Sequence, residues 1–224
     1  ASGLGWLPDG TLVVSTLFDA KVHYLTPTGR TTVDLGAHAF MTNDLLVMPG
    51  GLTYVDLYRF TDSGLEGDIA VLDRHGGIRV VAAGLATPNG LGLLPDGSTL
   101  VVSETHGARI LAFPVESDGS LGTATVFAEL GSGRHPDGLC VDAEGAVWVG
   151  CYDTGEFLRV VAGGAVTHRV AIEGGWAVAP ALGGADGRTL YLVVADTTDE
   201  DLVRGESTGW IMLARVEVPG IGSP

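Results

Sequence analysis

A strand–turn–strand pattern occurs five times along this chain, and this repetition constrains its fold more than any other feature. Each copy has a short apolar segment, a turn with Pro, Asp or Gly, and a second segment rich in β-branched residues. Two further strands follow the hairpin in each of the first four copies. Four antiparallel strands that recur about every 40–45 residues are typical of a β-propeller blade. The copies begin at Ser2, Asn43, Asn89, Asp137 and Trp176.

The turns support the same interpretation. A tight hairpin needs a positive φ, which Gly adopts without steric cost. No stretch combines helical periodicity with a capping signature for more than about two turns. We therefore predict an all-β fold, a single β-propeller domain over residues 1–224. The turn glycines are Gly10, Gly51, Gly97, Gly145 and Gly187. The approximate repeats are 2–40, 41–86, 87–133, 134–174 and 175–219.

The fifth repeat has one strand fewer than the other four. It offers three strands, at 177–183, 189–196 and 209–218, and the tail after them is unsuited to a central strand. A propeller that closes by pairing its two ends would take the fourth strand from a segment before the first repeat. We expect such an N-terminal segment, and a whole blade with it, to be absent from this chain. The alternative is a five-bladed ring whose last blade is incomplete.

Composition limits the partners. The chain has 12 Lys and Arg against 27 Asp and Glu, a net charge of −15. Phosphate backbones and anionic membranes repel such a chain, which argues against nucleic acid and membrane partners. No apolar run approaches the roughly 18 residues of a membrane span, and no signal peptide is visible. Cys140 and Cys151 are predicted as free buried thiols rather than a disulfide, which favours a cytoplasmic location.

The residues just before the first strand of each repeat carry the candidate chemistry. In a propeller these first strands line the central channel, so their ends meet at a common mouth. Four of the five positions are polar: Ser2, Asn43, Asn89 and Asp137. Their oxygens suit a hard cation such as Ca²⁺, Mg²⁺ or Mn²⁺. The alternative is structural, because Asn-Gly and Asp-Gly are favoured turn dipeptides.

Several segments resemble the SMP-30/gluconolactonase family, also called regucalcin-like lactonases. The resemblance is carried most diagnostically by TPNGLGLLPDGSTLVVSETHGARILAF (87–113) and HPDGLCVDAEGAVWVG (135–150), and also by 2–15, 42–51 and 182–196. It implies a six-bladed β-propeller with one divalent metal ion, of which Ca, Zn, Mn and Mg are all candidates. It also implies hydrolysis of a sugar lactone or a similar cyclic ester.

The resemblance assigns roles to particular residues. Asn89 and Asp137 correspond to metal ligands of the family, and Asp137 would also accept a proton from the attacking water. Asn43 corresponds to the Asn that contacts the sugar. His135 lies two residues before Asp137, and we expect it to contact substrate.

The chain departs from the family pattern at two places. The first-blade Glu that completes the metal site has no counterpart, and Met41 stands where some members carry a substrate-binding Arg. The alternative function is therefore a non-catalytic or truncated propeller scaffold. A further possibility is another propeller hydrolase or a relative of strictosidine synthase.

Two segments between strands are predicted as long loops. The acidic segment 196–207 is expected to be a solvated excursion near the channel. The segment 56–68 is expected to be a loop whose Tyr58, Arg59 and Phe60 either contribute to a lid or pack in the ordinary way.

Overall fold

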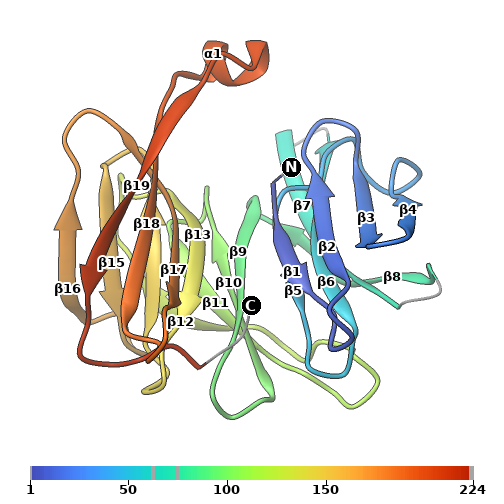
Figure 1. Cartoon of the computed structure of the whole chain (residues 1–224), viewed down its shortest axis with the longest axis horizontal. Helices are drawn as coiled ribbons and strands as arrows, with labels where there is room; N and C mark the ends of the chain where they lie inside the picture. The colour runs from blue at the N-terminus through green and yellow to red at the C-terminus, as the bar shows by residue number, and fades with distance from the viewer. Residues whose placement is uncertain (1, 62–63, 74–75, 222–224) are drawn as a thin grey trace.

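The computed structural model describes residues 2–61, 64–73 and 76–221. Five antiparallel sheets form a β-propeller, and each sheet corresponds to one sequence repeat (Figure 1). The first contains β1 (Leu4–Trp6), β2 (Leu12–Thr16), β3 (Lys21–Thr26) and β4 (Gly29–Asp34). The second contains β5 (Leu45–Val47), β6 (Thr53–Thr61), β7 (Gly64–Leu72) and β8 (Ile78–Leu85).

The remaining sheets repeat this order. The third contains β9 (Pro88–Leu93), β10 (Thr99–Glu104), β11 (Arg109–Pro114) and β12 (Thr125–Glu129). The fourth contains β13 (Pro136–Val141), β14 (Val147–Cys151), β15 (Glu156–Val160) and β16 (Val166–Ala171). The fifth contains β17 (Trp176–Gly183), β18 (Thr189–Asp196) and β19 (Thr208–Arg215). The predicted all-β propeller, with three strands in its last sheet, is confirmed over the described residues.

The predicted turn glycines adopt the expected conformation. At Gly10, Gly51, Gly97, Gly145 and Gly187, φ lies between 69° and 86°. A side chain at these positions would strain the backbone, so the hairpins depend on Gly.

Apolar side chains fill the space between neighbouring sheets. Along β10, Val101 packs against the fourth sheet, whereas Leu100 and Val102 pack against the second. Successive side chains of a strand point to opposite faces, so a strand covered on both faces reads as a continuous apolar run. This explains why β10 and β14, which are buried on both faces, are apolar without alternation.

The first strands of neighbouring sheets lie against one another, in the order β1, β5, β9, β13 and β17. Figure 1 shows the first and last sheets on opposite sides of the fold, with the third between them. The backbones approach closely. A Cβ atom on Gly90 would lie 2.5 Å from the Leu139 nitrogen, and one on Gly138 would lie 2.7 Å from the Ala179 Cβ. These glycines are therefore needed for packing between sheets.

Gly90→Ala should destabilise the protein, because the added methyl group must push β9 away from β13. We expect a loss of about 1–3 kcal/mol, typical of overpacking. Thermal unfolding checks this, and Gly29→Ala is a matched control because nothing lies within 4 Å of its Cβ position. Equal melting temperatures for the two variants would contradict the close-packing interpretation.

The segment 56–68 is not a loop, so that prediction was wrong. β6 and β7 continue as one hairpin, in which Tyr58 pairs with Gly67 and Phe60 with Leu65. Residues 62 and 63 lie outside the described part of the chain. Tyr58 is buried, and Arg59 forms an ion pair with Asp68 at 2.7 Å. The polar residues suggested a loop, but the ion pair satisfies Arg59 within the sheet.

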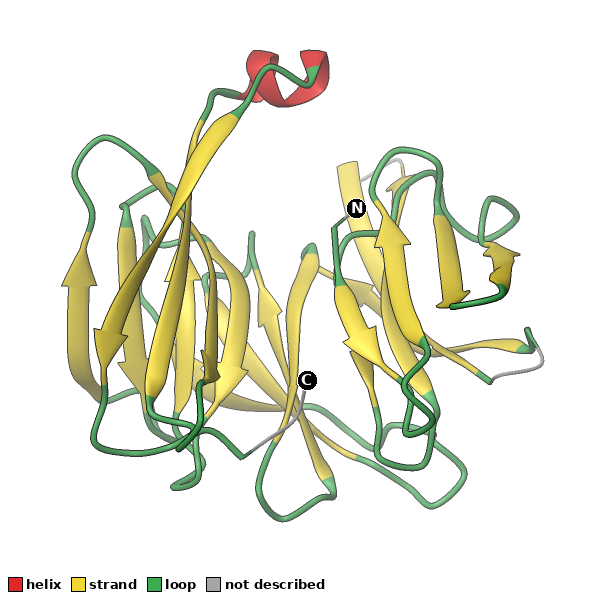
Figure 2. Ribbon diagram, viewed as in Figure 1, coloured by secondary structure: helices red, strands yellow, loops and turns green. Residues whose placement is uncertain are grey.

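The acidic segment 196–207 contains the short helix α1 (Asp199–Arg204). The Thr198 side chain accepts a hydrogen bond from the Asp201 nitrogen, and Gly205 ends the helix at a φ of 69°. This is the capping pattern of a helix N-terminus and C-terminus. Figure 2 shows the helix at the tip of an arm formed by β18 and β19, and none of its residues is buried.

Two smaller predictions concern cysteines and membranes. Both cysteines are free. Burial, followed by the charge of Glu156, raises the pKa of the Cys151 thiol to about 12. Among the described residues, no helix has the length and apolar character that crossing a membrane requires.

Candidate functional site

Four of the five equivalent positions come together across the inner strands, and hydrogen bonds join the first three of them. The Ser2 hydroxyl donates to Asn43 Oδ1, and Asn43 Nδ2 donates to Asn89 Oδ1 at 3.1 Å. The Asn89 side chain in turn lies close enough to the Asp137 carboxylate to lower its pKa. Asn43 precedes β5, whereas Asn89 and Asp137 lie in β9 and β13. The structure therefore brings together three of the residues that the sequence predicted for the site.

The turn interpretation of the Asn-Gly and Asp-Gly pairs does not hold. Asn89 and Gly90 lie inside β9, and Asp137 and Gly138 lie inside β13. Neither glycine has a positive φ. The dipeptide serves two purposes here, since the first residue carries a polar side chain and the glycine permits close packing of the next strand.

Asp44 belongs to this cluster, although the sequence analysis did not select it. Its carboxylate accepts a hydrogen bond from the Leu45 nitrogen at 2.8 Å and lies near the Leu91 backbone of β9. Burial raises the pKa of Asp44 to about 6. Burial, followed by the negative charge of Asp44, raises the pKa of Asp137 to about 7. The sequence did contain a signal for Asp44, because a carboxylate replaces the glycine that the neighbouring repeats have at this position, Gly90 and Gly138.

Asp56 positions the two site residues that precede β5. It is fully buried in β6, and its carboxylate accepts hydrogen bonds from the backbone nitrogens of Asn43 at 2.5 Å and Asp44 at 2.9 Å. Burial raises the pKa of Asp56 well above its usual value. Next to it, the Tyr58 hydroxyl donates to the Pro88 carbonyl at 2.5 Å, one residue before Asn89. The sequence signal for a role of Asp56 was its position as a charged residue within an otherwise apolar segment.

His135 lies at the rim of the same end of the fold. Its Nδ1 is 2.8 Å from Asp153 Oδ2, and its backbone nitrogen donates to Asp153 Oδ1 at 2.9 Å. Asp153 therefore fixes both the ring and the backbone of His135. Tyr152 stacks beside the ring, with 5.9 Å between centroids.

The donor set fits a divalent cation. Asp44 and Asp137 are two half-buried carboxylates. Among the described residues, no Lys or Arg lies close enough for its positive charge to lower the pKa of either carboxylate. Two such carboxylates with carboxamide oxygens beside them are hard ligands that leave negative charge uncompensated. Within residues 2–61, 64–73 and 76–221, no three His, Cys, Asp or Glu side chains form a group suited to a metal. Asn89 would therefore have to contribute a ligand oxygen.

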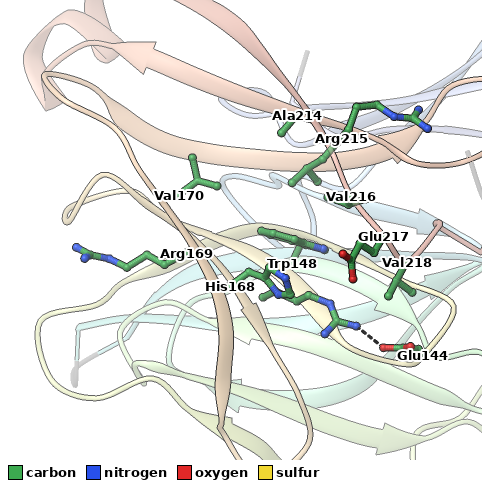
Figure 3. Close-up of a pocket in the computed structure, with 12 residues that line it drawn as sticks. Glu144, Trp148, His168, Arg169, Val170, Ala214, Arg215, Val216, Glu217 and Val218 are labelled. Atoms are coloured by element: carbon green, nitrogen blue, oxygen red, sulfur yellow. Dashed lines mark hydrogen bonds and ion pairs between the residues drawn. The ribbon is translucent and has the colours of Figure 1, made fainter.

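A cavity of about 440 Å³ lies elsewhere, between the fourth and fifth sheets. Figure 3 shows Trp148, His168 and Arg169 on one side of it and Arg215 on the other. Its cationic side chains are already paired, as Arg159 is with Glu144 at 2.8 Å. The cavity does not include the Asp137 cluster, and we assign it no part in the chemistry.

The sequence is similar to a known protein family and to a curated relative. The SMP-30/Gluconolactonase/LRE-like region family matches residues 2–196. Pentonolactonase XacC of Haloferax volcanii is 25% identical over 190 residues, which cover 81% of this chain and 64% of the relative. The chain thus spans less than two thirds of the length of this curated relative.

Solved structures share the fold. The luciferin-regenerating enzyme has a TM-score of 0.82 and 18% identity, with 99% of this chain and 80% of that chain covered. A putative gluconolactonase has a TM-score of 0.75 and 20% identity, with coverage of 97% and 74%. At these identities the likeness concerns the arrangement of the strands alone.

Proposed function

Because this chain belongs to the SMP-30/gluconolactonase/LRE-like family, we propose that it is a metal-dependent hydrolase of a sugar lactone or a similar cyclic ester. One observation carries the proposal. The polar residues at the inner ends of successive sheets form a single connected cluster, with Asp44 and Asp137 as its carboxylates. A propeller that served only as a scaffold would gain no stability from two half-buried carboxylates whose charges repel each other.

Each residue of the cluster has a proposed task. Asn89, Asp137 and Asp44 would hold a divalent ion, which supplies Lewis-acid polarisation of the ester carbonyl when it is bound. The Asp137 carboxylate accepts a proton from the water whose oxygen attacks the carbonyl carbon. The ring C–O bond then breaks, the departing oxygen takes up that proton, and the product is an open-chain hydroxy acid. Asn43 orients the ring by hydrogen bonds to its hydroxyl groups.

The experiment is a pH-indicator assay of D-glucono-1,5-lactone, corrected for spontaneous hydrolysis. The protein is freed of metal with a chelator and then supplied with Mn²⁺, Ca²⁺, Mg²⁺ or Zn²⁺ in turn. We expect chelation to lower kcat/KM at least about 100-fold, since carbonyl polarisation by a metal contributes several kcal/mol. At least one of the four ions should restore it.

Two results would count against the proposal. Full activity after complete metal removal would contradict the metal dependence. Absence of hydrolysis with every ion and with several lactone ring sizes would instead favour the binding scaffold.

A further inference from the structure

Four rings line the rim beside the Asp137 cluster, and the proposed function gives them no task. His106 and His135 have ring centroids 5.8 Å apart, His135 and Tyr152 are 5.9 Å apart, and Tyr152 and Trp176 are 5.1 Å apart. They come from three successive sheets. His106 follows β10, His135 and Tyr152 flank β13 and β14, and Trp176 begins β17. We call these four residues the aromatic arc.

The arc lies at the same end of the fold as the cluster. Trp176 occupies the repeat position that Asn43, Asn89 and Asp137 occupy in the other sheets. Burial, followed by the charges of Asp153, Asp199 and Asp137, raises the pKa of Tyr152. The Tyr152 hydroxyl is therefore close enough to Asp137 to be influenced by its charge.

Polar contacts hold the arc in place. The Thr87 hydroxyl lies 2.6 Å from His106 Nδ1, and Asp153 holds His135 as described above. The backbone of Trp176 is fixed by its pairing with Ala195 in β18, and its ring packs against that of Tyr152. His135, Tyr152 and Trp176 are half-buried, so part of each ring remains open. Rings that are rigid before binding lose little conformational freedom when a ligand covers them.

We propose that Tyr152 and Trp176 form a stacking surface for the ring of an uncharged lactone and thereby determine substrate specificity. This inference rests on the proposed function and narrows its substrate class. The apolar C–H face of a sugar or lactone ring suits the face of an aromatic ring, which buries it without demanding hydrogen bonds. Tyr152 and Trp176 offer two such faces, inclined at 48° to each other. The charges of Asp153 and Asp199 act on Tyr152, and they disfavour a substrate that carries a carboxylate. They also favour departure of the carboxylate product.

The first test compares Trp176→Ala and Tyr152→Ala with the unmodified protein. We expect KM for D-glucono-1,5-lactone to rise about 5- to 10-fold in each variant, the size of one aromatic contact. The value of kcat should change less than about threefold, because the rings bind the ground state and transition state alike. Tyr152→Phe keeps the ring and should restore the original KM. Trp6→Ala is the matched control, since Trp6 is 43% exposed on β1 and lies outside the site.

A binding measurement separates this inference from the proposed function. D-Glucono-1,5-lactam has the ring but resists hydrolysis, and saturation-transfer NMR reports its contact with aromatic protons. Binding in the unmodified protein that is lost in Trp176→Ala supports the stacking surface even if no lactone is hydrolysed. Hydrolysis with an unchanged KM in both alanine variants would overturn the stacking surface and leave the hydrolase intact. Absence of both binding and hydrolysis would overturn the two together.

Charge selectivity supplies a second test. D-Glucaro-1,4-lactone carries a carboxylate and should have a higher KM than an uncharged 1,4-lactone of the same ring size. Asp199→Asn should reduce this difference about two- to threefold at low salt and less at high salt, because exposed charges are screened. An unchanged difference in this variant would contradict a role for Asp199 in selecting uncharged substrates.

Discussion

Asp137→Ala should lower kcat/KM for a sugar lactone at least about 1,000-fold, because it removes both the proposed base and a ligand oxygen. Binding of the divalent ion should fall with it, as titration calorimetry would show. The melting temperature of the metal-free protein should not fall. Asp137 and Asp44 are two half-buried carboxylates, and the charge of one disfavours the charge of the other. Removing one of them relieves this repulsion.

Two controls make the Asp137 result specific. Asp137→Asn keeps the size and one oxygen of the side chain, and we expect it to be nearly as inactive as the alanine variant. Glu173→Ala removes an exposed carboxylate just before β17 and should retain full activity. If Asp137→Ala keeps turnover within about tenfold of the original, the assignment of this residue as base and ligand is wrong.

Asp142→Leu should produce the largest loss of stability, about 3–5 kcal/mol, because it removes the buried partner of Arg159 and leaves this Arg with only the exposed Glu144. Asp142 is fully buried, and its Oδ2 accepts from Arg159 Nε at 2.7 Å. Its Oδ1 accepts from the backbone nitrogens of Glu144 at 2.9 Å and Ala146 at 3.1 Å. One carboxylate thus satisfies both the cation and the turn between β13 and β14. For a chain of this size we expect the melting temperature to fall by roughly 10 °C.

A double variant shows whether the cost comes from the unpaired charge. Asp142→Leu combined with Arg159→Met removes both charges and should recover part of the stability lost in the single variant. The exposed pair of Arg215 and Asp186, at 2.6 Å, is the comparison, and Arg215→Ala should change the melting temperature little. Equal effects of Asp142→Leu and Arg215→Ala would contradict the argument. Below the unfolding transition, lactone hydrolysis should be unaffected, since Asp142 lies at the opposite end of β13 from Asp137.

The strand boundaries illustrate what local sequence determines. A hairpin needs only a few consecutive residues, so a turn glycine such as Gly97 and the apolar runs beside it carry the information themselves. The same holds for the repeat, because each sheet is built from one continuous segment of chain. The order of the sheets follows, since each packs on its neighbour in the sequence. Asn43, Asn89 and Asp137 were found in the same way, as equivalent positions of that repeat.

The sequence by itself determined the blades and the three polar positions, whereas the tertiary structure decided what surrounds them. Asp44 becomes a site residue only when the fold brings its carboxylate near the Leu91 backbone of β9, nearly 50 residues away in the chain. Tyr152 and Trp176 look like ordinary core residues until sheets four and five place their rings 5.1 Å apart. The segment around Arg59 resembles a loop until Asp68 neutralises its charge across the hairpin. Burial and charge act between residues distant in the chain, so local pattern cannot contain them.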